Sequence, residues 1–192
     1  MRQIEKGCNL KTSYLGYTPL HAAASMGNYE IVSLLIGNGI DLNLQDDNGN
    51  GYTPLHWATQ EAHKEIVELL VESGANMDIV DCNNYAPLHI SSSEGYLEIC
   101  EYLLNKGANT EVGYEECTPL HLACVYGHIG IVELLVNYEA NIEAKDRSGK
   151  TPLFQAAVYR HGEVASLLIK KGANRHVIDI TGENLQSYLI DI

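Results

Sequence analysis

The stretch TPLHLACVYGHIGIVELLVNYEAN, residues 118–141, decides the fold, because its landmarks recur at a nearly constant spacing along the chain. The opening TPLH block has four further copies: TPLH at Thr18–His21 and Thr53–His56, APLH at Ala86–His89 and TPLF at Thr151–Phe154. The five blocks begin at residues 18, 53, 86, 118 and 151, so successive starts lie 35, 33, 32 and 33 residues apart. This period is typical of a repeat protein, in which units too small to fold alone stack into one continuous core.

Each copy predicts a pair of short helices. Thr or Ala followed by Pro is typical of a helix start, because Thr caps a helix and Pro is tolerated at the first helical position. About ten residues after the block, an apolar set such as IVELLV at 131–136 places its side chains on one face of a second helix. A glycine such as Gly127 breaks the first helix, and one such as Gly107 ends the second helix in a left-handed cap. Residues rich in Asn, Asp and Gly then predict a hairpin that leads to the next unit.

The pattern of TPLH, glycine, apolar set and Gly-Ala at a period of about 33 residues resembles the ankyrin repeat family, and the resemblance covers nearly the whole chain. It implies an all-α repeat solenoid, in which each unit contributes a helix–turn–helix and a short β-hairpin. We expect a single domain, 1–192, of about five full units with partial units at both ends. The full units are expected at 13–47, 48–80, 81–112, 113–145 and 146–178, between a partial unit at 1–12 and a partial C-terminal unit at 179–192.

The shorter stretch CTPLHLACVYGH, residues 117–128, raises the question of a zinc site. Its Cys117, His121, Cys124 and His128 are residue types that bind zinc. The repeat favours another interpretation, because the histidine of TPLH stands in three other units where no cysteine accompanies it. In ankyrin repeat proteins this histidine is structural and hydrogen-bonds to the backbone between neighbouring units. We therefore expect no metal site and no cofactor.

The sequence offers no catalytic motif. It contains no P-loop, no GxSxG and no HExxH, so we expect that the protein is not an enzyme. No apolar run approaches the roughly 20 residues that cross a bilayer, and the N-terminus lacks the apolar stretch of a signal peptide. The five cysteines form no paired pattern, which favours reduced thiols in an intracellular protein, cytoplasmic or nuclear, without membrane association.

The charge distribution bears on the class of partner. The net charge is −13, and residues 12–144 contain 19 acidic and two basic side chains, which gives a local charge of −17. A surface this acidic repels phosphates, so we expect no nucleic-acid partner. We expect instead a monomeric protein that binds a protein partner, whose identity the sequence does not name.

Positions that differ between the copies are expected to face outward and to carry the function. In proteins similar to this one, partners meet the concave side of the array, formed by hairpin tips and the exposed faces of the first helices. Tyrosine is frequent at these positions and offers a large rigid surface at low entropic cost. Carried over by register, the candidate partner-binding residues are Tyr14, Tyr17, Met26, Tyr52, Trp57, Gln60, Glu61, Tyr85, Glu94, Tyr114, Glu115, Tyr126, Arg147, Lys150 and Tyr159.

The resulting hypothesis is a non-enzymatic protein–protein interaction module whose partner binds a concave, Tyr-rich face. Lys145, Arg147 and Lys150 close the C-terminal end of this face, so a partner basic toward one end and acidic toward the other suits it. Two alternatives stay open. The hairpin tyrosines can simply stack along the array, and the array can serve as a structural spacer or a targeting array within a larger protein.

Several positions depart from the repeat pattern. The hairpin at 46–52 is two residues longer than the period requires, either as a protruding contact or as a tolerated insertion. Glu139 replaces the glycine that ends the second helix, while Ala62 and Arg160 replace the glycine between helices. Half a cap for the last unit is expected from Leu185, Tyr188 and Leu189.

Overall fold

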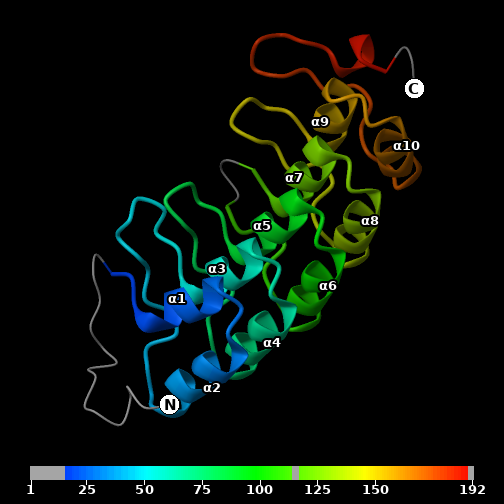
Figure 1. The fold of residues 1–192 in the computed structure, drawn as a ribbon. Helices are drawn as coiled ribbons and strands as arrows, with labels where there is room; N and C mark the ends of the chain where they lie inside the picture. Colours follow the sequence, from blue (N-terminus) through cyan, green and yellow to red (C-terminus); the bar gives the residue numbers. More distant parts are fainter. Residues whose placement is uncertain (1–15, 114–116, 190–192) are drawn as a thin grey trace.

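The fold is an array of stacked helix pairs. The structure, a computed structural model, describes residues 16–113 and 117–189, and within these ranges the chain forms ten α-helices (Figure 1). In chain order they are α1 (Pro19–Ser25), α2 (Tyr29–Gly37), α3 (Pro54–Gln60), α4 (Lys64–Glu72), α5 (Pro87–Glu94), α6 (Leu97–Asn105), α7 (Pro119–Tyr126), α8 (Ile129–Asn137), α9 (Pro152–Val158) and α10 (Gly162–Lys170), followed by the 3₁₀-helix η2 (Leu185–Ser187). The expected all-helical repeat solenoid of about five units is confirmed.

The helices form two layers. Figure 1 shows the first helix of each pair (α1, α3, α5, α7 and α9) along one side of the array and the second helix (α2, α4, α6, α8 and α10) along the other. Each first helix packs against the next first helix, and each second helix packs against the next second helix. The loops that join one pair to the next project from the side of the first helices (Figure 1). In the part of the chain that the structure describes, no helix combines the length and the apolar composition needed to span a bilayer.

The loops between pairs close as hairpins without forming strands. The Asp46 amide donates to the Tyr52 carbonyl at 2.9 Å, and the Asp146 amide donates to the Lys150 carbonyl at 3.0 Å. Each of these two expected β-hairpins is therefore reduced to one backbone hydrogen bond between its arms, because the residue that follows the second arm already caps the next helix. Residues 16–113 and 117–189 contain no β-strand. In the longer loop at 46–52, the Asn50 carbonyl accepts a hydrogen bond from the next unit.

The TPLH block begins each first helix through a reciprocal cap. In the fourth unit the Thr118 hydroxyl accepts from the His121 amide at 3.4 Å, while the Thr118 amide donates to His121 Nδ1 at 3.2 Å. Two helix-end groups are satisfied at once, as in a capping box, with histidine in the place of the usual Glu or Gln. In the third unit, where Ala86 lacks a hydroxyl, the Ala86 amide still donates to His89 Nδ1 at 3.1 Å.

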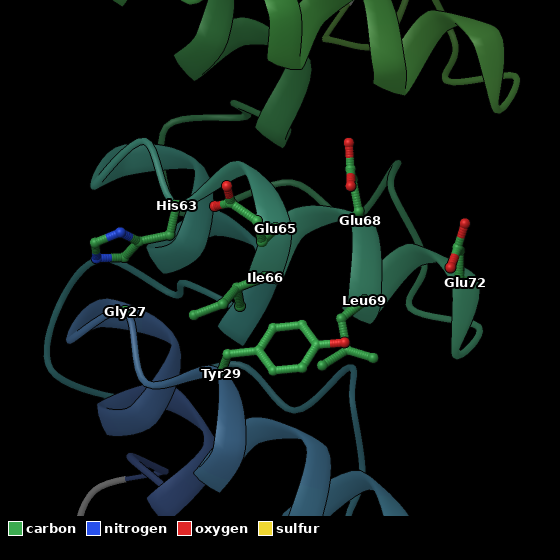
Figure 2. Close-up of a pocket in the computed structure, with 8 residues that line it drawn as sticks. All are labelled: Gly27, Tyr29, His63, Glu65, Ile66, Glu68, Leu69 and Glu72. Atoms are coloured by element: carbon green, nitrogen blue, oxygen red, sulfur yellow. The ribbon is translucent and has the colours of Figure 1, made fainter.

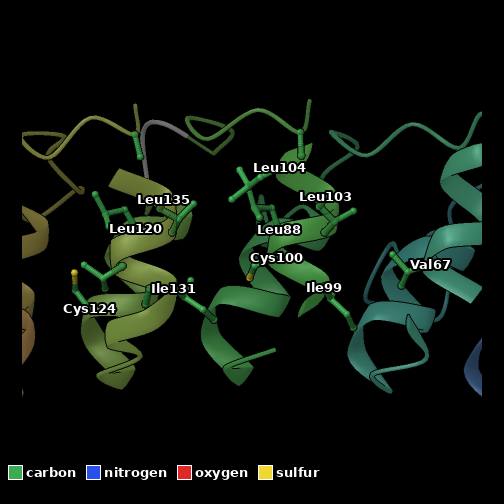
Figure 3. Close-up of a cluster of buried hydrophobic side chains, with 14 of the residues drawn as sticks. Val67, Leu88, Ile99, Cys100, Leu103, Leu104, Leu120, Cys124, Ile131 and Leu135 are labelled. Atoms are coloured by element: carbon green, nitrogen blue, oxygen red, sulfur yellow. The ribbon is translucent and has the colours of Figure 1, made fainter. Parts of the chain in front are cut away.

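The core runs between the two layers along the array. The leucine of each TPLH block is at most 1 % exposed. Figure 3 shows part of this core, where Leu88 and Leu120 of the first helices lie among Ile99, Leu103 and Leu135 of the second helices. Burying a side chain of this size stabilises the fold by about 1.5–3 kcal/mol, so stacking supplies what a single unit lacks.

The predicted departures from the repeat keep the repeat's backbone. Glu139 has φ of 62°, and Ala62 and Arg160 have φ of 56° and 62°, so all three adopt the left-handed conformation of the glycines they replace. At the C-terminal end, Leu185 is fully buried, and the Tyr188 ring lies 5.7 Å from that of Phe154. These side chains pack against the fifth unit, as expected for half a cap.

Candidate functional site

The histidines of the TPLH blocks tie each unit to the next. In His89, Nδ1 accepts from the Ala86 amide, and Nε2 donates to the Cys117 carbonyl of the following unit at 2.8 Å. His56 and His121 make the corresponding bonds to the carbonyls of Tyr85 at 2.9 Å and Lys150 at 3.1 Å. Burial lowers the pKa of all four TPLH histidines, most clearly for His89, whose pKa is about 4. These rings are therefore neutral structural groups at physiological pH.

Three of the four residues that raised the question of zinc, His121, Cys124 and His128, have structural roles of this kind. Both ring nitrogens of His121 engage the protein, through Thr118 and Lys150. His128 Nε2 donates to the Ser93 carbonyl at 2.9 Å, and Cys124 is completely buried in the core. Among the described residues, no three or more His, Cys, Asp or Glu side chains are grouped so as to hold a metal ion.

The hairpin tyrosines pack on the histidines of their own units. The rings of Tyr17, Tyr52 and Tyr85 stack on His21, His56 and His89 with centroids 5.4, 5.3 and 5.2 Å apart. All three tyrosines are half-buried, and burial raises the pKa of Tyr17 and Tyr52. Each of these three tyrosines thus contacts the histidine that joins its unit to the next one.

Trp57 completes an aromatic cluster near the N-terminal end of the array. Its ring meets Tyr17 and Tyr52 edge-on, at 6.0 and 5.2 Å between centroids. Its Nε1 donates to Asp46 Oδ2 at 2.7 Å, which fixes the ring. The cluster is rigid and half-buried, so it offers edges rather than whole faces to the outside.

A second group of the predicted residues remains open to solvent. One position, at the end of each first helix, carries three different residue types among the five units, and all five side chains are exposed. We call this set the exposed row; it consists of Met26, Glu61, Glu94, Tyr126 and Tyr159. Met26 is 80 % exposed, and Tyr126 and Tyr159 are 56 % and 53 % exposed.

The remaining predicted residues have different surroundings. Gln60 is half-buried beside Glu61, and Arg147 is exposed on the hairpin loop before α9. Lys150 Nζ lies 3.5 Å from Asp179 and 3.7 Å from Glu183, and it also lies 5.4 Å from the Phe154 ring centroid. Lys150 therefore belongs to the contacts of the C-terminal segment. Tyr14, Tyr114 and Glu115 lie outside the described residues.

A groove between α2 and α4 was not among the predicted features. Its volume is about 520 Å³, and Figure 2 shows its lining residues, Gly27, Tyr29, His63, Glu65, Ile66, Glu68, Leu69 and Glu72. It lies in the layer of second helices, and its lining residue Gly27 directly follows Met26 of the exposed row in the chain. The sequence feature that could have indicated this groove is the first position of the second helices, which holds Tyr29 in the first unit and Lys64 in the second.

Comparisons with known proteins agree with the repeat pattern. A family model described as ankyrin repeat matches residues 15–47, and one described as ankyrin repeats in three copies matches residues 43–114 and 108–179. The matches together extend from residue 15 to residue 179 of the 192. A comparison with curated proteins finds no significant match.

Proposed function

The chain belongs to the ankyrin repeat family, whose repeats generally serve in protein–protein interaction, and from that premise we propose that it binds a partner protein through the face of its first helices and hairpin loops. The proposal includes no catalytic step and no cofactor. It places the protein in the cytoplasm or nucleus, where buried thiols such as those of Cys100 and Cys124 stay reduced.

The observation that carries the proposal is the exposed row. Positions that hold the array together have the same residue type in nearly every unit, as the TPLH leucine does. The exposed row changes from Met26 through Glu61 and Glu94 to Tyr126 and Tyr159, and all of these side chains reach solvent. Side chains that differ at one backbone position and remain exposed are free to match a partner.

The order of residues in the exposed row indicates the chemistry of the partner. Two glutamates in the middle units favour a partner segment with basic residues at its centre. Met26 at one end, and Tyr126 and Tyr159 at the other, favour apolar or aromatic groups on both sides of that centre. The sequence predicted a partner with an acidic end that would face Lys150. Because Lys150 is paired with Asp179, that acidic end is not part of this proposal.

Truncating the apolar members of the exposed row tests the proposal. A Met26→Ala/Tyr126→Ala/Tyr159→Ala variant should keep its helical circular dichroism and lose a protein that the parent co-purifies from lysate of the source organism. The matched control removes three exposed apolar side chains from the layer of second helices, Leu97→Ala/Ile129→Ala/Tyr138→Ala, and should retain that protein. Retention by the first variant and loss by the control contradicts the proposal.

The middle of the exposed row is tested through charge. Glu61→Lys/Glu94→Lys should abolish binding of the same protein, while Glu101→Lys/Glu133→Lys, which reverses two exposed charges in the other layer, should leave it bound. Equal binding by the parent and by both reversals would favour the alternative, in which the array acts as a spacer or targeting array.

A further inference from the structure

The groove between α2 and α4 carries a second inference, independent of the exposed row. We propose that this groove binds a basic amphipathic helix of a partner protein. The apolar side of that helix lies on Tyr29 and Leu69, and its basic side faces the glutamates of α4. A helix laid in a groove is a common way of recognising a peptide, with contacts repeating every three to four residues.

The apolar part of the groove is formed by both helices. Ile66 of α4 forms a buried floor at 2 % exposure, and Leu69 beside it is half-buried. Tyr29 remains 47 % exposed, and Figure 2 shows its ring extending from α2 toward Leu69. An apolar side chain placed between these two removes tyrosine and leucine surface from water, which favours binding by about 25 cal/mol per Å² of apolar area.

The α4 side of the groove is acidic along its length. Glu65, Glu68 and Glu72 follow one another at intervals of three and four residues, so they lie along one side of the helix. Figure 2 shows Glu68 and Glu72 pointing away from Tyr29, at the rim of the groove. The lining residues include no lysine or arginine. Lysines spaced three to four residues apart on a partner helix match this rim.

Comparison with the contact between α4 and α6 shows which charge the groove between α2 and α4 lacks. Between α4 and α6, Lys64 at the start of α4 pairs with Glu98 of α6 at 2.7 Å. Between α2 and α4 the corresponding residues are Tyr29 and Glu65, so a tyrosine stands where the second junction has its cation. Among the described residues, Glu65 has no ion pair. A lysine of the partner helix supplies the cation that the chain itself supplies one unit later.

The other two glutamates of the rim have weak local pairs. Glu68 lies 4.0 Å from Lys64, which is already engaged by Glu98, and Glu72 lies 3.5 Å from Lys106. Both pairs are partly exposed, so they are screened by water and exchange with an incoming lysine at little cost. The charge of the rim excludes an anionic occupant such as a nucleic acid or an acidic lipid surface.

A defined probe tests the proposal with the full chain. The probe is a fluorescently labelled synthetic peptide of about 18 residues, with leucine on one helical face and lysine on the other, and its affinity is measured by fluorescence anisotropy at about 0.15 M salt. Tyr29→Lys places a cation beside Glu65 and removes the apolar contact, so it should weaken binding by about tenfold or more. Glu65→Gln should weaken binding by about threefold.

Two controls separate the groove from general attraction to an acidic protein. Glu101→Gln/Glu133→Gln removes two exposed charges from the same layer outside the groove and should change the affinity by less than about twofold. A peptide with glutamate in place of lysine should not bind. Equal weakening by the control variant, unchanged affinity in Tyr29→Lys, or no binding of the basic peptide to the parent each overturns the proposal.

A second measurement keeps the test independent of variant folding. In the parent protein, NMR shifts on adding the basic peptide should concentrate in α2 and α4, and shifts centred elsewhere would contradict the proposal. The Met26→Ala/Tyr126→Ala/Tyr159→Ala variant should bind this peptide like the parent. Failure of one proposal is thereby distinguished from failure of the other.

Discussion

Acidification should destabilise the array through the buried histidines, and His89 gives the clearest case. Its Nδ1 accepts a hydrogen bond from the Ala86 amide, and its Nε2 donates one to the Cys117 carbonyl. The bond from the Ala86 amide exists only while Nδ1 carries no proton, so the two bonds occur together only in the neutral ring. Burial, the largest influence, lowers the pKa of His89 from 6.5 to about 4, although the Cys117 carbonyl acts in the opposite direction.

The size of the effect follows from linkage between protonation and folding. Because the pKa is lower in the folded state, the neutral ring stabilises the fold fully above pH 6.5, and this contribution is lost as the pH falls through about 4. With each pH unit worth about 1.4 kcal/mol, His89 alone accounts for a loss of about 2 kcal/mol at pH 5 and about 3 kcal/mol at pH 4. The pKa of His21, His56 and His121 is lowered in the same direction, so their contributions add to this loss.

Urea unfolding between pH 7 and pH 4.5 measures the loss. His89→Gln should be less stable than the parent at pH 7, because two buried hydrogen bonds change, but it should lose about 2 kcal/mol less between pH 7 and pH 5. The control is His176→Gln at an exposed histidine, which should follow the parent's pH dependence. Identical pH slopes in the parent and His89→Gln would refute the reasoning. An NMR titration that gave His89 an ordinary pKa near 6.5 in the folded parent would refute it as well.

Three further predictions concern stability and are measured by chemical or thermal unfolding. Glu139→Gly should stabilise the protein by about 0.5–1 kcal/mol, because glycine adopts the left-handed conformation without the strain of a side chain. Gly107→Ala, at the equivalent position and with open space around it, should destabilise the protein by about 1 kcal/mol. Gly95→Ala should cost about 1–3 kcal/mol and disturb the NMR signals of His128, whose ring would lie 2.7 Å from the added methyl group. Leu185→Ala should cost about 2–4 kcal/mol and raise hydrogen exchange first in the fifth unit; unchanged exchange there would count against the C-terminal segment as a cap.

The fold was accessible from the sequence because its determinants are local and recur in phase. A threonine before proline, a glycine in a left-handed turn and an apolar helical face each act within a few residues. The departures from the repeat were accessible as well. Glu139 occupies a position that holds glycine in other units, and it adopts the left-handed φ of those glycines. The β-hairpins were less accessible, since their closure by one backbone bond depends on where the next helix cap begins.

The candidate site was accessible only by position. Register identifies which residues lie on hairpin loops and first helices, but it does not distinguish Tyr85, stacked on His89, from Tyr126, which is exposed. That difference arises from packing between side chains within a unit. Asp179 itself stands in register, 33 residues after Asp146, but its pairing with Lys150 depends on a lysine at a hairpin position where Tyr52 and Tyr85 stand in other units.

The turn between the helices of a unit shows why units are not interchangeable. Gly27 lies so close to the His63 ring of the next unit that an added methyl group would come within 2.7 Å of it. In the second unit this glycine is replaced by Ala62, and there the facing residue is Tyr96 instead of histidine. Both departures from the repeat pattern therefore occur at the same junction between two units. Residues at such junctions are constrained in pairs by their neighbours. The side chains of the exposed row reach solvent instead, and for that reason we expect the partner's chemistry to be encoded there.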